Sequence, residues 1–234
     1  MVAKISQLFL RVSPYVALGL FPVTLWCVFF WVPSDAFLGL SQRIFYYHVP
    51  GAITCFVGFT AGGVASGLFL KTGNIDWDHA AHASVGVGLL FGTILLVTGS
   101  IWARTAWGTW WTWDARLTTF LVLWLIFASY LLLRTMADDN EMMPRWAAVL
   151  AIVGCVNIPV VQFATRLWRT IHPQVIRNPD GGINDPAMQA TLGLCLIAYL
   201  VMFTWLWALR VRLLRMHDRV DYLLDEAYRE GSTQ

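Results

Sequence analysis

Residues 83–103 read ASVGVGLLFGTILLVTGSIWA, an apolar stretch without a charged side chain. A helix needs about 20 predominantly apolar residues to cross the hydrocarbon core of a bilayer. The apolar residues here are continuous and do not alternate with polar ones, which favours a helix over a strand of a membrane barrel. The stretch therefore predicts a transmembrane helix in an all-α membrane protein.

Five further runs along the chain have the same character. Hydrophobic residues make up 58% of the 234 residues and charged residues only 13%, whereas a typical soluble domain carries about 25% charge. Together the runs predict six transmembrane helices in a single domain over 1–234, at about 14–32, 49–70, 83–103, 117–134, 146–164 and 188–209. The first run lacks a small-residue cleavage site, so we expect it to be a retained span. The net charge of +2 is too small to indicate a nucleic-acid-binding protein.

An even number of spans places both chain ends on one side of the membrane and divides the loops into two groups. One group contains the N-terminus, 71–82, 135–145 and the tail 210–234, and the other contains 33–48, 104–116 and 165–187. With residues at span edges assigned to the nearer loop, the first group holds ten Lys and Arg residues and the second holds six. The positive-inside rule therefore predicts cytoplasmic termini and a second group that faces the periplasm of a bacterial inner membrane.

The loop 104–116 is rich in tryptophan. Residues 107–114 read WGTWWTWD, so Trp107, Trp110, Trp111 and Trp113 precede Asp114. If this stretch is helical, three of the tryptophans and Asp114 share one face and form a flat aromatic surface. Such a surface suits a large, flat, mostly apolar ligand, and an ordinary interfacial aromatic belt is the alternative. Asp114 is also placed to cap the N-terminus of the fourth span.

Two histidines belong to the same group of loops. His48 stands in YYHVP just before the second span, and His172 stands in TIHP in the last loop of this group. Two such histidines can bind a haem iron from opposite sides, although a single loop histidine is more often a polar surface residue. His48 lies near a helix N-terminus, whose positive end favours the neutral imidazole that a metal requires. The other three are expected at the surface of the opposite side: His79, His82 and His217.

Several other residues carry smaller expectations. Haem has two propionates, and guanidinium groups match carboxylates. The arginines that could pair with them are Arg116, Arg166, Arg169 and Arg177. The alternative is that these arginines contact only lipid headgroups or solvent.

The four cysteines stand in apolar runs without a C-x-x-C pair. This pattern predicts packing residues, and neither covalent haem attachment nor dithiol exchange. They are Cys27, Cys55, Cys155 and Cys195. The second and third spans contain the G-x-x-x-G spacings Gly58–Gly62 and Gly88–Gly92, which allow close helix contact.

The sequence resembles the haem-handling family that carries the tryptophan-rich WWD signature. The run GTWWTWDARLT around Asp114, YYHVP around His48 and VNIP at 156–159 carry the resemblance, which extends over essentially all six spans. Within that family the length and the number of spans are similar to CcmC-type members, since other members are typically larger. The resemblance implies that His48 and His172 are axial ligands of haem b, and that Trp107, Trp110, Trp111, Trp113, Asp114 and Arg116 form a platform for the haem edge.

The same resemblance implies a role without catalysis. Family members of this type present haem to the membrane-anchored chaperone CcmE during cytochrome c maturation, beside the ABC-transporter subunits CcmA and CcmB and the small protein CcmD. The chain contains no G-x-x-x-x-G-K-[ST] motif, so any ATP hydrolysis belongs to a partner.

Two other functions are consistent with a haem-binding membrane protein. A b-type cytochrome that carries electrons across the membrane generally needs histidine pairs at two depths, but both candidate ligands are expected at one face. A haem permease should place polar or ionisable groups at membrane depth, and the spans offer little beyond Asn157 and Gln162.

Overall fold

The part of the chain that the computed structural model describes is almost entirely helical. It covers residues 2–35, 38–136, 142–168, 170–172, 183 and 185–231. Six long helices follow one another: α1 (Val2–Trp26), α2 (Phe45–Thr72), α3 (Ile75–Trp107), α4 (Ala115–Thr135), α5 (Met143–Leu167) and α6 (Pro186–Gly231). Each is long and apolar enough to cross a membrane, which confirms the predicted all-α fold. The chain is a multi-pass membrane protein, and which side its termini face stays a prediction.

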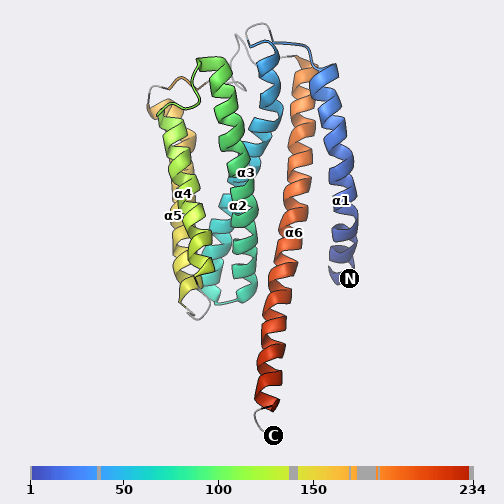
Figure 1. The fold of residues 1–234 in the computed structure, drawn as a ribbon, viewed down its shortest axis with the longest axis vertical. Helices are drawn as coiled ribbons and strands as arrows, with labels where there is room; N and C mark the ends of the chain where they lie inside the picture. Colours follow the sequence, from blue (N-terminus) through green and yellow to red (C-terminus); the bar gives the residue numbers. More distant parts are fainter. Residues whose placement is uncertain are drawn as a thin grey trace.

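The helices are arranged around the central pair α2 and α3. Helices α4 and α5 pack together on one side of this pair, and α6 packs on the other side (Figure 1). Helix α1 is peripheral and contacts mainly α6. Both chain ends point toward the same end of the bundle (Figure 1), as an even number of spans requires.

Glycines allow α2 and α3 to approach each other closely. A Cβ atom on Gly58 would stand 2.9 Å from the Cα of Gly88, and one on Gly62 would stand 2.6 Å from Cγ2 of Val85. Neither position leaves room for a larger side chain, so the G-x-x-x-G spacings do allow a close helix contact, and the structure shows that α2 and α3 make it with each other. The cysteines behave as expected of packing residues, because all four thiols are free and none is exposed.

Most helices extend further than their hydropathy indicated. A turn of 3-10 helix (Leu40–Ile44) leads directly into α2, which begins at Phe45 and not near residue 49, and a π-helical turn (Cys27–Trp31) prolongs α1. Helix α3 continues to Trp107, which reduces the tryptophan-rich loop to residues 108–114. Helix ends project beyond the hydrocarbon core and carry polar and aromatic residues, so an apolar window underestimates their length. Helix α6 also includes most of the tail 210–234.

A buried ion pair and a partly buried histidine–aspartate contact connect the helices at the end of the bundle where the chain termini lie. Arg134 of α4 donates two hydrogen bonds to the carboxylate of Asp78 on α3, at 2.6 and 2.7 Å. Nε2 of His79 lies 2.8 Å from the carboxylate of Asp218 on α6. The prediction that His79 is a surface residue is wrong, since it is only 5% exposed. The long α6 covers the first turns of α3, and sequence patterns do not reveal that contact.

Candidate functional site

A cavity of about 460 Å³ lies at the opposite end of the bundle, between the ends of α2, α3, α4 and α5. Binding sites for small molecules commonly have volumes of about 300–1,000 Å³ and mostly apolar walls. Here aliphatic and aromatic side chains form much of the wall, including Val49, Ile53, Phe56, Leu96, Leu117 and Phe120. The cavity therefore has the size and lining of a site for a largely apolar ligand.

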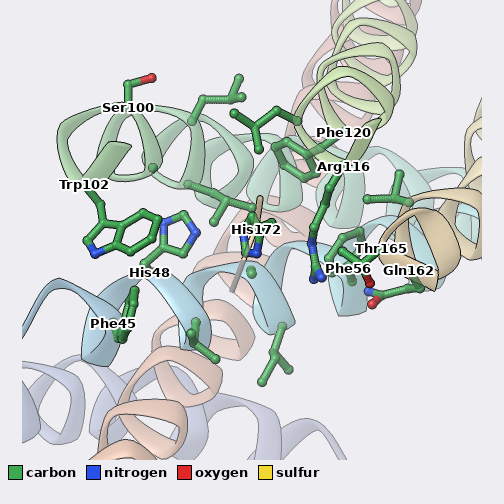
Figure 2. A pocket seen from close by; sticks show the side chains of 18 of the residues that line it. Phe45, His48, Phe56, Ser100, Trp102, Arg116, Phe120, Gln162, Thr165 and His172 are labelled. Atoms are coloured by element: carbon green, nitrogen blue, oxygen red, sulfur yellow. The ribbon is translucent and has the colours of Figure 1, made fainter. Parts of the chain in front are cut away.

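His48 and His172 line this same cavity, although 123 positions separate them in the sequence. Figure 2 shows both imidazole rings within it. His48 belongs to α2 itself, and not to the loop before it as the hydropathy indicated. Nδ1 of the His48 ring lies 3.0 Å from Oγ1 of Thr98 on α3, so this ring is held between two helices.

His172 belongs to the connection between α5 and α6, and Asp114 ties this connection to α4. One carboxylate oxygen of Asp114 accepts the backbone N–H of Arg116 at 2.9 Å, which caps α4 as the sequence predicts. The other oxygen accepts the backbone N–H of Ile171 at 3.2 Å. Burial alone would raise the pKa of Asp114, but hydrogen bonds from the Thr170 side chain and from these two backbone groups outweigh it and lower the pKa. Asp114 is therefore an anionic anchor for the backbone next to His172.

The four predicted tryptophans do not share one face. Gly108 ends α3 with a left-handed φ of +75°, and the next residues are not helical. As a result Trp107 and Trp111 line the cavity, whereas Trp110 and Trp113 are 60% and 77% exposed. The helical arrangement that would place Trp107, Trp110 and Trp111 on one surface is wrong because glycine at Gly108 turns the chain.

A fifth tryptophan, which lies inside the predicted span 83–103, also lines the cavity. Trp102 is buried and packs against Phe45 and Trp107, with ring centroids 5.2 and 5.0 Å apart. The ring of Trp107 in turn meets the His172 ring edge-on at 6.5 Å. Five positions separate Trp102 from Trp107, and a helix brings together residues three or four apart, so the sequence does not indicate this contact.

Two of the four predicted arginines lie at the cavity. The side chains of Arg116 and Arg166 both line it, and Figure 2 shows Arg116 reaching into it beside Phe56 and Gln162. The Arg116 guanidinium makes no hydrogen bond to any other residue that the structure describes. Arg169 and Arg177 lie outside the described residues.

The chemistry of this lining suits haem. Two imidazoles can supply axial nitrogen ligands, the apolar and aromatic walls match the faces of a porphyrin, and Arg116 offers a guanidinium for a carboxylate. The indole N–H of Trp111 is also buried without a hydrogen-bond partner in the described part of the chain. Buried polar groups normally have such partners, so this N–H is available to donate a hydrogen bond to a ligand with acidic groups.

Comparison with known proteins assigns the chain to a family. The family model described as CcmC, heme exporter protein C, matches residues 1–224. The heme exporter protein C of Escherichia coli (strain K12) is 34% identical over 205 residues, which are 87% of this chain and 83% of that protein. The proteins of the same name from Bradyrhizobium diazoefficiens and Haemophilus influenzae are 34% and 33% identical over 80% and 77% of this chain, and over 72% and 74% of their own lengths. The chain therefore belongs to the CcmC family of heme exporter proteins.

Proposed function

We propose that the chain binds haem b in the cavity through His48 and His172 and presents it to the haem chaperone CcmE during cytochrome c maturation. The observation that carries this proposal is that two imidazoles from distant parts of the chain line one apolar cavity. Membership of the CcmC family supports haem as the ligand. The haem is cargo in this function, so the chain needs residues that bind, orient and release it and no residue that catalyses a reaction.

The two histidines are expected to differ in how firmly they are held. His48 is part of α2 and has a side-chain partner on α3, whereas the backbone next to His172 is anchored through Asp114. A ligand on a rigid helix and a ligand on a connecting segment suit a site that must both hold a large cargo and let it go. We infer that His48 keeps the haem in place and that release begins on the His172 side.

The guanidinium of Arg116 is the best-placed partner for a propionate. It lines the cavity together with Arg166, and it makes no hydrogen bond within the described part of the chain. A charge-assisted hydrogen bond from arginine to a carboxylate is roughly twice as strong as a neutral one. Arg116 would therefore fix the haem's rotation about the axis through the iron.

The exposed tryptophans Trp110 and Trp113 suit contact with a protein partner. Exposed aromatic side chains beside a binding site are typical of residues that dominate protein interfaces. We assign this surface to CcmE, in a complex with CcmA, CcmB and CcmD in the bacterial inner membrane. In this arrangement the 108–114 loop faces the periplasm, in agreement with the charge bias of the loops.

The positions of the other histidines favour this role over transmembrane electron transfer. An electron carrier generally holds haems at two depths, but His79, at the far end of the bundle, is engaged by Asp218. The cavity that both candidate ligands line lies at the opposite end, which contains His48.

Axial ligation is tested by the visible spectrum of the purified protein with haem. His48→Ala and His172→Ala should each remove the low-spin bis-histidine spectrum, and added imidazole should restore part of it by filling the vacant position. His82→Ala is the matched control, because His82 is a partly buried histidine at the opposite end of the bundle. Loss of the spectrum in His82→Ala, or its survival in His48→Ala, would contradict the ligand assignment.

A further inference from the structure

We propose that Thr98 and Gly99, two neighbouring residues of α3, position the His48 imidazole so that its Nε2 presents a lone pair to the iron. This inference rests on the proposed function, because it requires His48 to be an axial ligand. Neither residue touches the iron in this proposal, so both are positioning residues that act through His48.

The hydrogen bonds of Thr98 determine which nitrogen of His48 carries the proton. Oγ1 of Thr98 lies 2.8 Å from the carbonyl oxygen of Ile94 and 3.0 Å from Nδ1 of His48. A hydroxyl has one proton to donate, and a carbonyl oxygen can only accept. The proton of Thr98 therefore goes to Ile94, and the hydroxyl oxygen must accept from Nδ1–H of His48.

This assignment leaves Nε2 as the unprotonated nitrogen of a neutral ring. Only an unprotonated nitrogen can bind a metal, and the group bonded to the other nitrogen selects the tautomer. The contact also makes the ring a stronger electron donor, because an acceptor at Nδ1–H increases the basicity of the imidazole. Thr98 thus prepares His48 as a ligand before haem arrives.

Gly99 provides the space in which the ring lies. A Cβ atom on Gly99 would stand 3.0 Å from Cε1 of His48, which is tighter than an ordinary contact between carbon atoms. Glycine in the middle of a helix is less favourable than alanine, so α3 is less stable as a helix at this position. The benefit is that the imidazole can pack directly on the backbone of α3, next to its partner Thr98.

The first test replaces the hydroxyl without changing the shape of the side chain. Thr98→Val should weaken haem binding by the full chain in detergent at least tenfold, since partners of metal-bound histidines typically contribute 10- to 100-fold in affinity. It should also shift the midpoint potential of the bound haem to a more positive value, because a weaker donor stabilises ferric iron less. Thr98→Ser keeps the hydroxyl and should restore both properties.

Thr204→Val is the matched control for the lost hydroxyl. Among the described residues, Oγ1 of Thr204 on α6 bonds only to carbonyl groups of its own helix, at 2.9 and 3.0 Å, so its removal should change neither affinity nor potential. Equal affinity and potential in Thr98→Val and Thr204→Val would overturn the proposal.

A second variant tests the space next to the ring. Gly99→Ala should displace the His48 ring, weaken haem binding several-fold and alter the low-spin spectrum. Gly86→Ala on the same helix is the control, because nothing lies within 4 Å of a Cβ atom added there. An unchanged spectrum and affinity in Gly99→Ala would exclude the role of Gly99 in positioning the His48 ring.

The failure of this inference can be separated from the failure of the proposed function. If His48→Ala keeps the bis-histidine spectrum, the ligand assignment itself is wrong. If His48→Ala loses that spectrum while Thr98→Val and Gly99→Ala behave as wild type, His48 is a ligand and the positioning role of α3 is wrong.

Discussion

The two ends of the helix bundle both bury polar side chains, but these side chains differ in what they bond to. At the end that holds the chain termini, Asp78 is paired with Arg134 and His79 with Asp218. At the other end, Arg116 and Trp111 line a cavity, and the indole N–H of Trp111 is buried with no hydrogen-bond partner among the described residues. Leaving a buried polar group unpaired costs free energy. The Asp78–Arg134 and His79–Asp218 contacts connect α3 to α4 and α6, whereas Arg116 and Trp111 line the cavity, where a ligand can reach them.

The largest effect on stability is expected at the end of the bundle that holds the chain termini. Arg134→Met removes one partner of a buried, doubly hydrogen-bonded ion pair and leaves the Asp78 carboxylate buried without its partner. Breaking a buried pair in this way typically costs about 3–5 kcal/mol. The free energy of unfolding in detergent should fall by about that amount, while the folded fraction keeps its haem spectrum.

The control for this prediction is an exposed ion pair between α3 and α6. Arg215 and Asp76 are 2.7 Å apart and more than half exposed, so Arg215→Met should cost at most about 1 kcal/mol. If folded Arg134→Met loses its haem spectrum, the two ends are functionally coupled and the division between them is wrong.

A smaller effect should separate the tryptophans inside the cavity from those outside it. Trp111→Ala should weaken haem binding roughly three- to tenfold, because an aromatic contact contributes about 0.5–1.5 kcal/mol beyond its buried area. The double variant Trp110→Ala/Trp113→Ala should bind haem normally and yield less covalently haem-loaded CcmE in cells, normalised to the amount of each variant. Normal loading of CcmE by the double variant would exclude contact with CcmE as the role of these exposed residues and would favour a role as a membrane-interface anchor.

The smallest effect concerns the anchor next to His172. The pKa of Asp114 is lowered in the folded protein, so its contribution to stability is present above the unfolded pKa of about 3.9 and is lost as the pH falls through the folded value. Asp114→Asn should keep the cap of α4, since asparagine is also a good N-cap, but should lose the stronger bond from a charged acceptor. The difference in thermal midpoint between wild type and Asp114→Asn should therefore be larger at pH 7 than at pH 3, and an equal difference at both would exclude this role.

The six spans could be predicted because each is a continuous apolar run, which is visible in the local sequence without knowledge of tertiary contacts. Their ends could not be predicted as well. Helix α2 begins at Phe45 and α3 continues to Trp107, where aromatic and polar residues lie beyond the hydrocarbon core and no longer contribute an apolar signal. That error matters for the site, because it moves His48 from a loop onto a helix next to Thr98.

The candidate site was predicted in part. Parity of the spans placed His48, His172 and the tryptophans at one face, and the structure brings both histidines, Trp107, Trp111 and Arg116 to one cavity. Whether they bind haem remains a proposal. The sequence does not indicate that Trp102, Thr98 and Gly99 belong to the site. Each is an ordinary residue of a transmembrane helix until its neighbour on another segment is known.

The sequence by itself determined that this chain crosses the membrane as six helices and that its chemically unusual residues gather at one face, because apolar length and span parity follow from the order of residues alone. Only the tertiary structure decided which polar groups are paired and which are open to a ligand. Asp78 meets Arg134 and His79 meets Asp218 across helices whose contacts are set by packing. The turn at Gly108 likewise precedes the change from Trp110, which is exposed, to Trp111, which lines the cavity, since a glycine in the left-handed conformation ends the helix and redirects the chain.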